Sequence, residues 1–125
     1  MCTVKEHDLV TLGFNICNAK ISSADICIEA HDVFACFIGI NTASWGSTIT
    51  LPLGTASYED DPFESTPGGT ECLYTLMRLV GVRSMSNLQN KFIRIACDSR
   101  GDVMYIGNIL TDDWVYFREF FKEAT

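Results

Sequence analysis

The chain has 125 residues, of which 47% are hydrophobic and 20% are charged, and its net charge is −7 at neutral pH. A chain of this length falls in the single-domain range and can bury one hydrophobic core, so we expect residues 1–125 to form one compact domain. Its longest apolar runs are shorter than the ~18 residues that a membrane-spanning helix needs, and its polar first residues are unlike a signal peptide. The composition therefore excludes a helical membrane protein and favours a protein of the cytoplasm.

The negative charge is concentrated in the first part of the chain. Residues 1–71 contain ten carboxylates and two basic residues, a charge of −8, whereas residues 72–125 contain six carboxylates and seven basic residues, a charge of +1. A surface that binds nucleic acid needs a basic face, so we expect no direct contact with nucleic acid. An acidic surface instead favours a protein partner with a basic surface.

The cysteines occur singly and lack the paired spacing of a metal site or a disulfide framework. There are six of them: Cys2, Cys17, Cys27, Cys36, Cys72 and Cys97. Without an export signal, we expect reduced thiols that pack as small hydrophobic side chains.

The first 53 residues contain three segments with strand patterns and a less regular beginning. In residues 1–19, apolar and polar side chains alternate from Val10 onward, which favours a strand. Residues 20–30 alternate more clearly and predict a second strand, with Ile26 and Ile28 on its apolar face. The nearly continuous apolar run at 33–40 is typical of a central strand, and 45–53 alternates again. Because the connections are short and polar, we expect an antiparallel meander.

The clearest helix of the sequence lies at 70–82. Its apolar residues follow the i, i+3, i+4, i+7 spacing of a stripe on one helical face, namely Leu73, Leu76, Met77 and Val80. Thr70 is placed to cap the start, and Gly81 offers the left-handed residue that ends helices. The stripe needs a surface to cover, and the runs 91–98 and 103–110 predict a hairpin that supplies it.

Two shorter elements complete the predicted fold. Ser84 or Ser86 is placed to cap a single turn that returns Leu88 to the core, and the segment from Trp114 onward favours a short amphipathic helix, with a strand at 114–117 as the alternative. We therefore predict an α+β fold: an antiparallel sheet of about five strands, one main helix packed on one face, and a short C-terminal helix.

One polar segment, between Gly54 and Gly69, is long for a connection without a function. Aromatic anchors beside carboxylates are typical of a surface that meets Lys or Arg side chains on a partner. The candidate partner-binding residues are Tyr58, Glu59, Asp60, Asp61, Phe63 and Glu64. A solvated loop kept soluble by its charge is the alternative, and a cation site is a weaker one because the glycine spacing of a calcium loop is absent.

No recognisable catalytic or metal-binding motif is present. The two histidines, His7 and His31, have no cysteine or histidine at metal-ligand spacing. His31 beside Asp32 has the residue types of a general base and its orienting carboxylate, but a hairpin turn explains the same pair. We therefore predict a non-catalytic protein without metal or cofactor; a small enzyme with a site assembled from residues distant in sequence is the alternative.

Two stretches of the second half carry a resemblance. They are Leu-Val-Gly-Val-Arg-Ser-Met-Ser-Asn-Leu-Gln-Asn-Lys-Phe-Ile-Arg-Ile at 79–95 and Tyr-Ile-Gly-Asn-Ile-Leu-Thr-Asp-Asp-Trp at 105–114. From about residue 69 to 114 the chain resembles small phage- and prophage-encoded proteins, in which an apolar helix ends in a valine-rich turn and an Ile-Gly-Asn strand ends at Trp. This resemblance implies a phage protein of the anti-defence kind, such as an anti-CRISPR protein, and carries over no catalytic positions.

From these features we predict a phage-encoded inhibitor that binds a host defence protein in the host cytoplasm through its acidic surface. A second alternative is an oligomeric structural component of a phage, and a homo-oligomer therefore remains open. Its self-association patch would use the aromatic residues Trp45, Trp114, Phe120 and Phe121.

Overall fold

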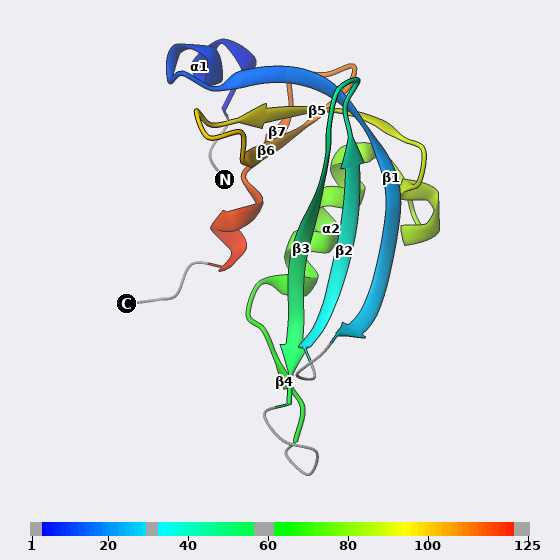
Figure 1. Ribbon diagram of the computed structural model, residues 1–125. Coiled ribbons are helices and arrows are strands. Elements are labelled where there is room, and N and C mark those ends of the chain that lie inside the picture. The colour runs from blue at the N-terminus through cyan, green and yellow to red at the C-terminus, as the bar shows by residue number, and fades with distance from the viewer. Residues whose placement is uncertain (1–3, 30–32, 57–61, 122–125) are drawn as a thin grey trace.

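The computed structural model describes residues 4–29, 33–56 and 62–121. Its framework is one antiparallel sheet in the order β4-β3-β2-β1-β5-β6-β7, curled into a half-barrel (Figure 1). The strands are β1 (Asn15–Glu29), β2 (Val33–Asn41), β3 (Gly46–Thr55), β4 (Glu64–Ser65), β5 (Phe92–Cys97), β6 (Val103–Asn108) and β7 (Trp114–Val115). The helices and helical turns are α1 (Glu6–Thr11), α2 (Gly69–Val80), η2 (Met85–Leu88) and η3 (Phe117–Phe121).

The α+β class and the antiparallel sheet are confirmed, but the strand count is corrected from about five to seven within the described residues. The difference comes from β4 and β7, which are only two residues long. Strands of this length leave no periodic pattern in a sequence.

Strand β1 connects the two parts of the sheet. Residues 15–20 pair with β5, and residues 20–29 pair with β2 on the other side. The register shifts between Ile21 and Ser23, and such a bulge bends and twists a strand. The meander over residues 20–53 and the hairpin over 91–110 are both confirmed by these ladders.

The predicted strand at the start of the chain is only partly right. Residues 6–11 form α1, whose start is stabilised by a hydrogen bond from the Lys5 backbone N–H to Asp8 Oδ2 at 3.0 Å. Leu9 is fully buried, whereas Val10 is exposed. The apolar alternation that favoured a strand therefore does not reflect burial, and β1 begins only at Asn15.

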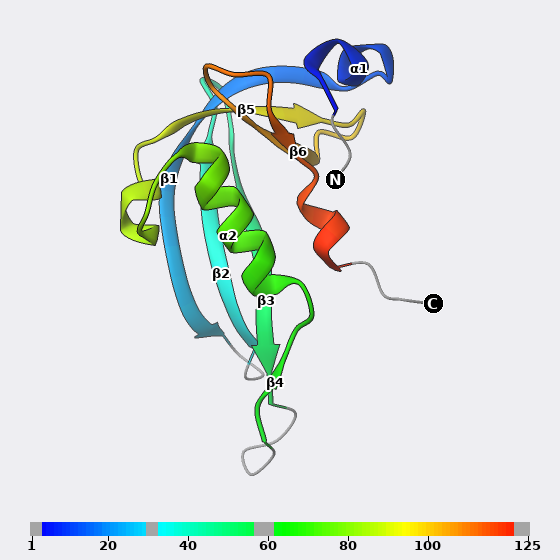
Figure 2. The same cartoon turned by 180° about the vertical axis from the view of Figure 1, so that it is seen from behind.

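Helix α2 packs on one face of the sheet, as predicted, and crosses the concave side of β1, β2 and β3 (Figure 2). The hairpin over residues 91–110, which the sequence predicted as the surface under the helix, supplies only part of this core. Its predicted end is confirmed, because Gly81 has a φ of 89° and its N–H donates to the Met77 carbonyl at 2.9 Å. Its predicted start is wrong: the N-cap is Gly68, with a φ of 86°, and Thr70 lies inside the helix. The predicted single turn is present as η2, where Leu88 is fully buried.

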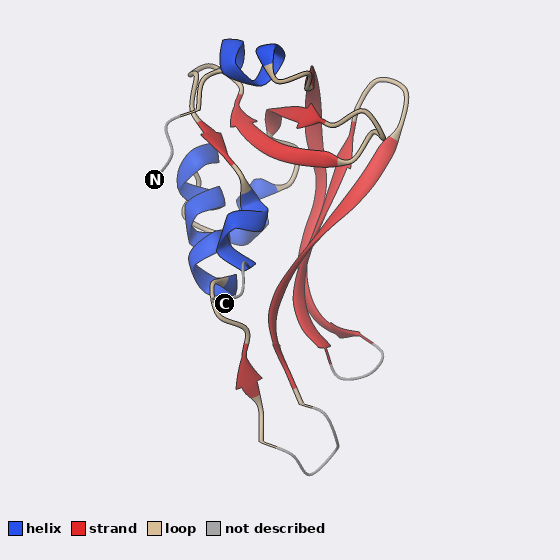
Figure 3. Ribbon diagram, turned by 90° about the vertical axis from the view of Figure 1, so that its left-hand side faces the viewer, coloured by secondary structure: helices blue, strands red, loops and turns tan. Residues whose placement is uncertain are grey.

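The main core lies between α2 and the concave face of the sheet. Its fully buried side chains come from β1, β2, β3, β5 and β6 and from α2 and η2. Among them are Ile21, Ile38, Ile40, Leu51, Cys72, Leu76, Leu88, Ile95 and Ile106. A smaller cluster lies on the opposite face, where α1 covers β5 and β6 through Leu9, Ala96 and Trp114. Figure 3 shows α2 on one side of the strands, with the lower ends of β1, β2 and β3 extending beyond it.

The predicted C-terminal helix is corrected to a short strand followed by a single 3₁₀ segment, η3. The alternative of a strand is right for its first two residues, because Trp114 pairs with Gly107. The indole lies directly on this glycine, where an added Cβ would be 2.6 Å from Trp114 Cε3. Trp114 is therefore buried, and Phe120 and Phe121 pack against the core. Of the four aromatic residues predicted for a self-association patch, Trp45 is the exposed one.

No helix of the described residues combines the length and the apolar character needed to cross a bilayer.

Candidate functional site

Only part of the predicted contact segment can be placed. Tyr58, Glu59, Asp60 and Asp61 lie outside the described residues, as does the His31–Asp32 pair. Phe63 and Glu64 are described, and both are exposed. Phe63 immediately precedes β4 and Glu64 begins it, and β4 pairs with Gly54 and Thr55 of β3. The segment therefore returns to the sheet at the far end of β3.

Phe63 is held in place at this end of the sheet. Its ring lies over Gly54, at a position that a Cβ on residue 54 would occupy. Phe34 meets it edge to face, with ring centroids 6.0 Å apart and an interplanar angle of 78°, which is a favourable aromatic geometry. More than half of Phe63, 56%, nevertheless remains exposed.

Two residues of β1 extend this exposed apolar surface. Ile26 pairs with Cys36 and Ile28 pairs with Phe34, and directly opposed residues of an antiparallel pair point to the same face of the sheet. Ile26 is 39% exposed and Ile28 is 69% exposed. We call the group formed by Ile26, Ile28, Phe34 and Phe63 the distal patch.

The distal patch was missed because the sequence predicted Ile26 and Ile28 as buried. Their alternation correctly places them on the face that α2 covers, but this end of β1 extends beyond the helix (Figure 3). The signal that was available is the length of the predicted elements: a strand at 20–30 spans about 36 Å and a helix at 70–82 only about 20 Å, because a strand rises about 3.3 Å per residue and a helix about 1.5 Å.

The stretch of sequence that contributes the distal patch carries only negative charge. Residues 21–77 contain no Lys or Arg, while their carboxylates are Asp25, Asp32, Glu29, Glu59, Asp60, Asp61, Glu64 and Glu71. Of these, Asp25, Glu29, Glu64 and Glu71 are described and exposed. A surface of one sign attracts a partner of the opposite sign and raises its association rate.

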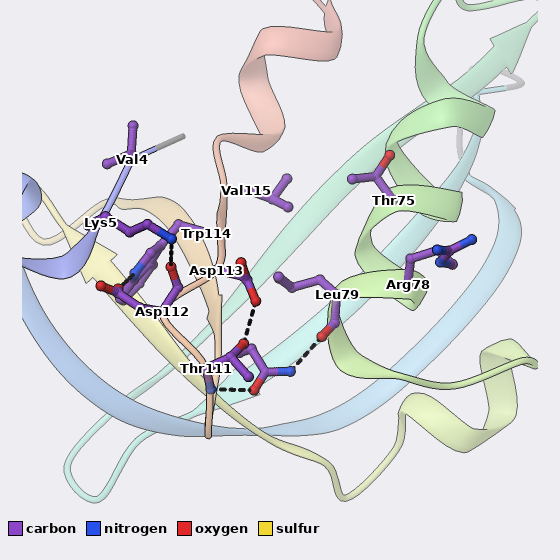
Figure 4. A pocket seen from close by; sticks show the side chains of 11 residues that line it. Val4, Lys5, Thr75, Arg78, Leu79, Thr111, Asp112, Asp113, Trp114 and Val115 are labelled. Atoms are coloured by element: carbon purple, nitrogen blue, oxygen red, sulfur yellow. Dashed lines mark hydrogen bonds between the residues drawn. The ribbon is translucent and has the colours of Figure 1, made fainter. Parts of the chain in front are cut away.

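A second concave site, of about 390 Å³, lies between α2, the residues before α1 and the segment linking β6 to β7 (Figure 4). Its carboxylates are already engaged. Asp112 accepts hydrogen bonds from Trp114 Nε1 and the Glu6 N–H, each at 2.8 Å, and these bonds lower the pKa of Asp112, the indole bond most. Asp113 accepts a hydrogen bond from Thr111 Oγ1 at 2.6 Å.

Arg94 organises one wall of this region. Its guanidinium donates to Glu6 Oε1 at 2.9 Å and to the Thr111 carbonyl at 2.7 Å, and it stacks 4.7 Å from the Trp114 ring. Within the described part of the chain, no buried side-chain nitrogen or oxygen lacks a hydrogen-bond partner. The polar groups here therefore connect the two ends of the chain and leave no buried group to recognise a ligand.

The three buried thiols of the described residues, Cys36, Cys72 and Cys97, are poor nucleophiles. Burial raises the pKa of Cys36 and of Cys97 to about 11 and that of Cys72 to about 12, whereas the reactive form of cysteine is the thiolate. His7, the histidine that is described, lies on the surface beside Asp8, with Nε2 3.1 Å from Oδ1. Three or more side chains suited to a metal ion do not converge anywhere in residues 4–29, 33–56 and 62–121.

Comparison of the chain with protein-family models, with curated proteins and with solved structures finds no match. The resemblance to phage proteins over residues 69–114 therefore stays a prediction.

Proposed function

We propose that this protein acts by binding another protein without catalysis, and that the distal patch and the acidic residues predicted at 59–64 form the contact surface. The observation that carries this proposal is the exposure of Ile28 and Phe63 at an end of the sheet that α2 does not reach. Exposed apolar side chains gathered at one place and rimmed by charge are typical of interaction sites. Phe63 would serve as the anchor, since one side of its ring already packs on Phe34.

The partner that fits is a host protein with a basic surface. Lys and Arg side chains of the partner would meet Glu29 and Glu64, and also Glu59, Asp60 and Asp61 of the predicted segment. The resemblance to anti-defence phage proteins supports a bacterial defence factor as the target, inhibited in the host cytoplasm.

The test uses variants of the distal patch with a matched control. Ile28→Ser and Phe63→Ser each remove an exposed apolar side chain from the patch, while Leu110→Ser removes one that is 90% exposed outside it. The readout is the plating efficiency of a phage targeted by a CRISPR system in cells that express each variant, together with affinity capture of the partner.

We expect both patch variants to lose about tenfold or more in partner affinity and to restore host defence, because anchor residues dominate binding energy. Leu110→Ser should retain both properties. The binding of the unaltered protein should weaken as salt rises, since charge pairing is screened. Equal inhibition by all three variants, in proteins with unchanged melting temperature, would contradict the proposal.

A further inference from the structure

Strand β3 is an edge strand along most of its length. Its outer neighbour β4 pairs only with Gly54 and Thr55, so in the described residues no strand pairs with the outer side of residues 46–52. Figure 1 shows β3 at the free side of the sheet, with η3 beyond it. An unpaired edge presents backbone N–H and C=O groups at the spacing of a β-ladder.

The main-chain groups that face this edge are those of Thr48 and Thr50. The Pro52 carbonyl oxygen lies against Gly69 of α2, so the main-chain groups of Pro52 point away from β2. The ladder between β2 and β3 is regular from residue 46 to 52, and the direction of main-chain groups alternates with a period of two along a strand. Thr48 and Thr50 therefore share the outward orientation of Pro52, and a proline is tolerated at such a position.

A groove of about 370 Å³ runs beside this edge. Residues 47–50 and Pro52 form one wall, and η3 together with the start of β6 forms the other. The apolar lining includes Ile49, Val103 and Phe117, each less than 10% exposed, and Phe121. The groove therefore combines unused main-chain groups on one side with apolar side chains on the other.

Two charged residues line the groove, Arg118 of η3 and Asp102 before β6. Neither belongs to any of the ion pairs formed among the described residues. Arg118 is exposed, and a guanidinium binds a carboxylate through two parallel hydrogen bonds. An acidic side chain on an incoming strand would form an ion pair with Arg118.

We propose that the free edge of β3 binds an extended peptide segment of a partner protein, which adds to the sheet as a further strand. Its main chain pairs with Thr48 and Thr50, one apolar side chain enters the groove toward Phe117, and an acidic side chain reaches Arg118. Strand addition at a sheet edge is an established mode of peptide recognition. Because η3 of the same chain bounds the space beside the edge, a single strand fits there better than the sheet of a second copy.

The test is selection of a displayed library of random decapeptides on the purified protein. Thr48→Pro removes an outward N–H while leaving the ladder to β2 intact, and Thr48→Val keeps the backbone and serves as the matched control. Arg118→Gln removes the charge that the acidic residue would meet. Melting temperatures establish that each variant is folded.

We expect enriched peptides that alternate apolar and polar residues and contain Asp or Glu. Their affinity should fall about tenfold or more with Thr48→Pro and with Arg118→Gln, and stay unchanged with Thr48→Val. Peptides N-methylated at alternate positions should fail to bind. The proposal is overturned by a library without enriched sequences, by peptides that bind Thr48→Pro as well as the unaltered protein, or by a concentration-dependent dimer that Thr48→Pro abolishes.

Discussion

Arg94 connects the N-terminal segment to the sheet through several hydrogen bonds. It lies in β5, and its guanidinium reaches α1 through Glu6 and the β6–β7 connection through the Thr111 carbonyl. Its Nε also donates to the Asn108 carbonyl at 3.0 Å. Only 16% of the side chain is exposed, so these bonds are weakly screened by solvent.

Replacement of Arg94 by alanine should therefore lower the free energy of unfolding by about 2 kcal/mol, since hydrogen bonds to charged groups contribute more than neutral ones. The measurement is urea denaturation followed by tryptophan fluorescence. Arg100→Ala is the control, because the Arg100 side chain is 82% exposed, and it should change stability by less than about 0.5 kcal/mol. A loss of similar size in both variants would show that the contacts of Arg94 are not stabilising.

At the scale of an element, α2 shows a helix end that is encoded locally. Gly81 has a φ of 89°, and an added Cβ would meet no atom within 4 Å. A side chain at position 81 would therefore destabilise the protein through the backbone conformation it must adopt, and not through a clash. We expect Gly81→Ala to lower the free energy of unfolding by about 1 kcal/mol and Gly81→Asn to lower it less, because Asn tolerates the left-handed region. Thermal unfolding measures both; an alanine variant as stable as the unaltered protein would contradict this.

The elements that the sequence predicted well are those whose signal is local. Helix α2, the meander and the later hairpin each show the spacing of apolar residues that their geometry requires. The elements that it missed depend on distant partners. Trp114 pairs as a strand because its ring lies on Gly107, and α1 forms where Leu9 fills a pocket over β5 and β6.

The same distinction explains how much of the candidate site could be predicted. Phe63 and Glu64 came from the composition of their segment, and the structure describes both as exposed. Ile26 and Ile28 were assigned to the correct face with the wrong burial. The alternation of apolar and polar residues along a strand indicates which of them share a face. Their exposure depends on how far a helix from elsewhere in the chain extends along the sheet.

For the whole molecule, coverage of the sheet changes along its length. Near β5, both faces are covered, by the core under α2 and by the cluster around Leu9. At the distal end, residues 25–29 of β1 are exposed, and the ladder to β2 continues there without a helix over it. Segments with few buried apolar contacts open locally at lower free energy than the core does.

Native-state hydrogen exchange should therefore show a gradient along β1 and β2. The amides of Ile21, Ile38 and Ile95 should exchange only through global unfolding, because these side chains are fully buried, whereas those of Ile26 and Ile28 should exchange through smaller openings. If the distal patch is the contact surface, binding of the partner should slow the exchange of the distal amides. The core amides should remain the slowest to exchange in the unbound protein. Uniform exchange along the whole of β1 would contradict the gradient, and unchanged distal exchange in the complex would place the partner elsewhere.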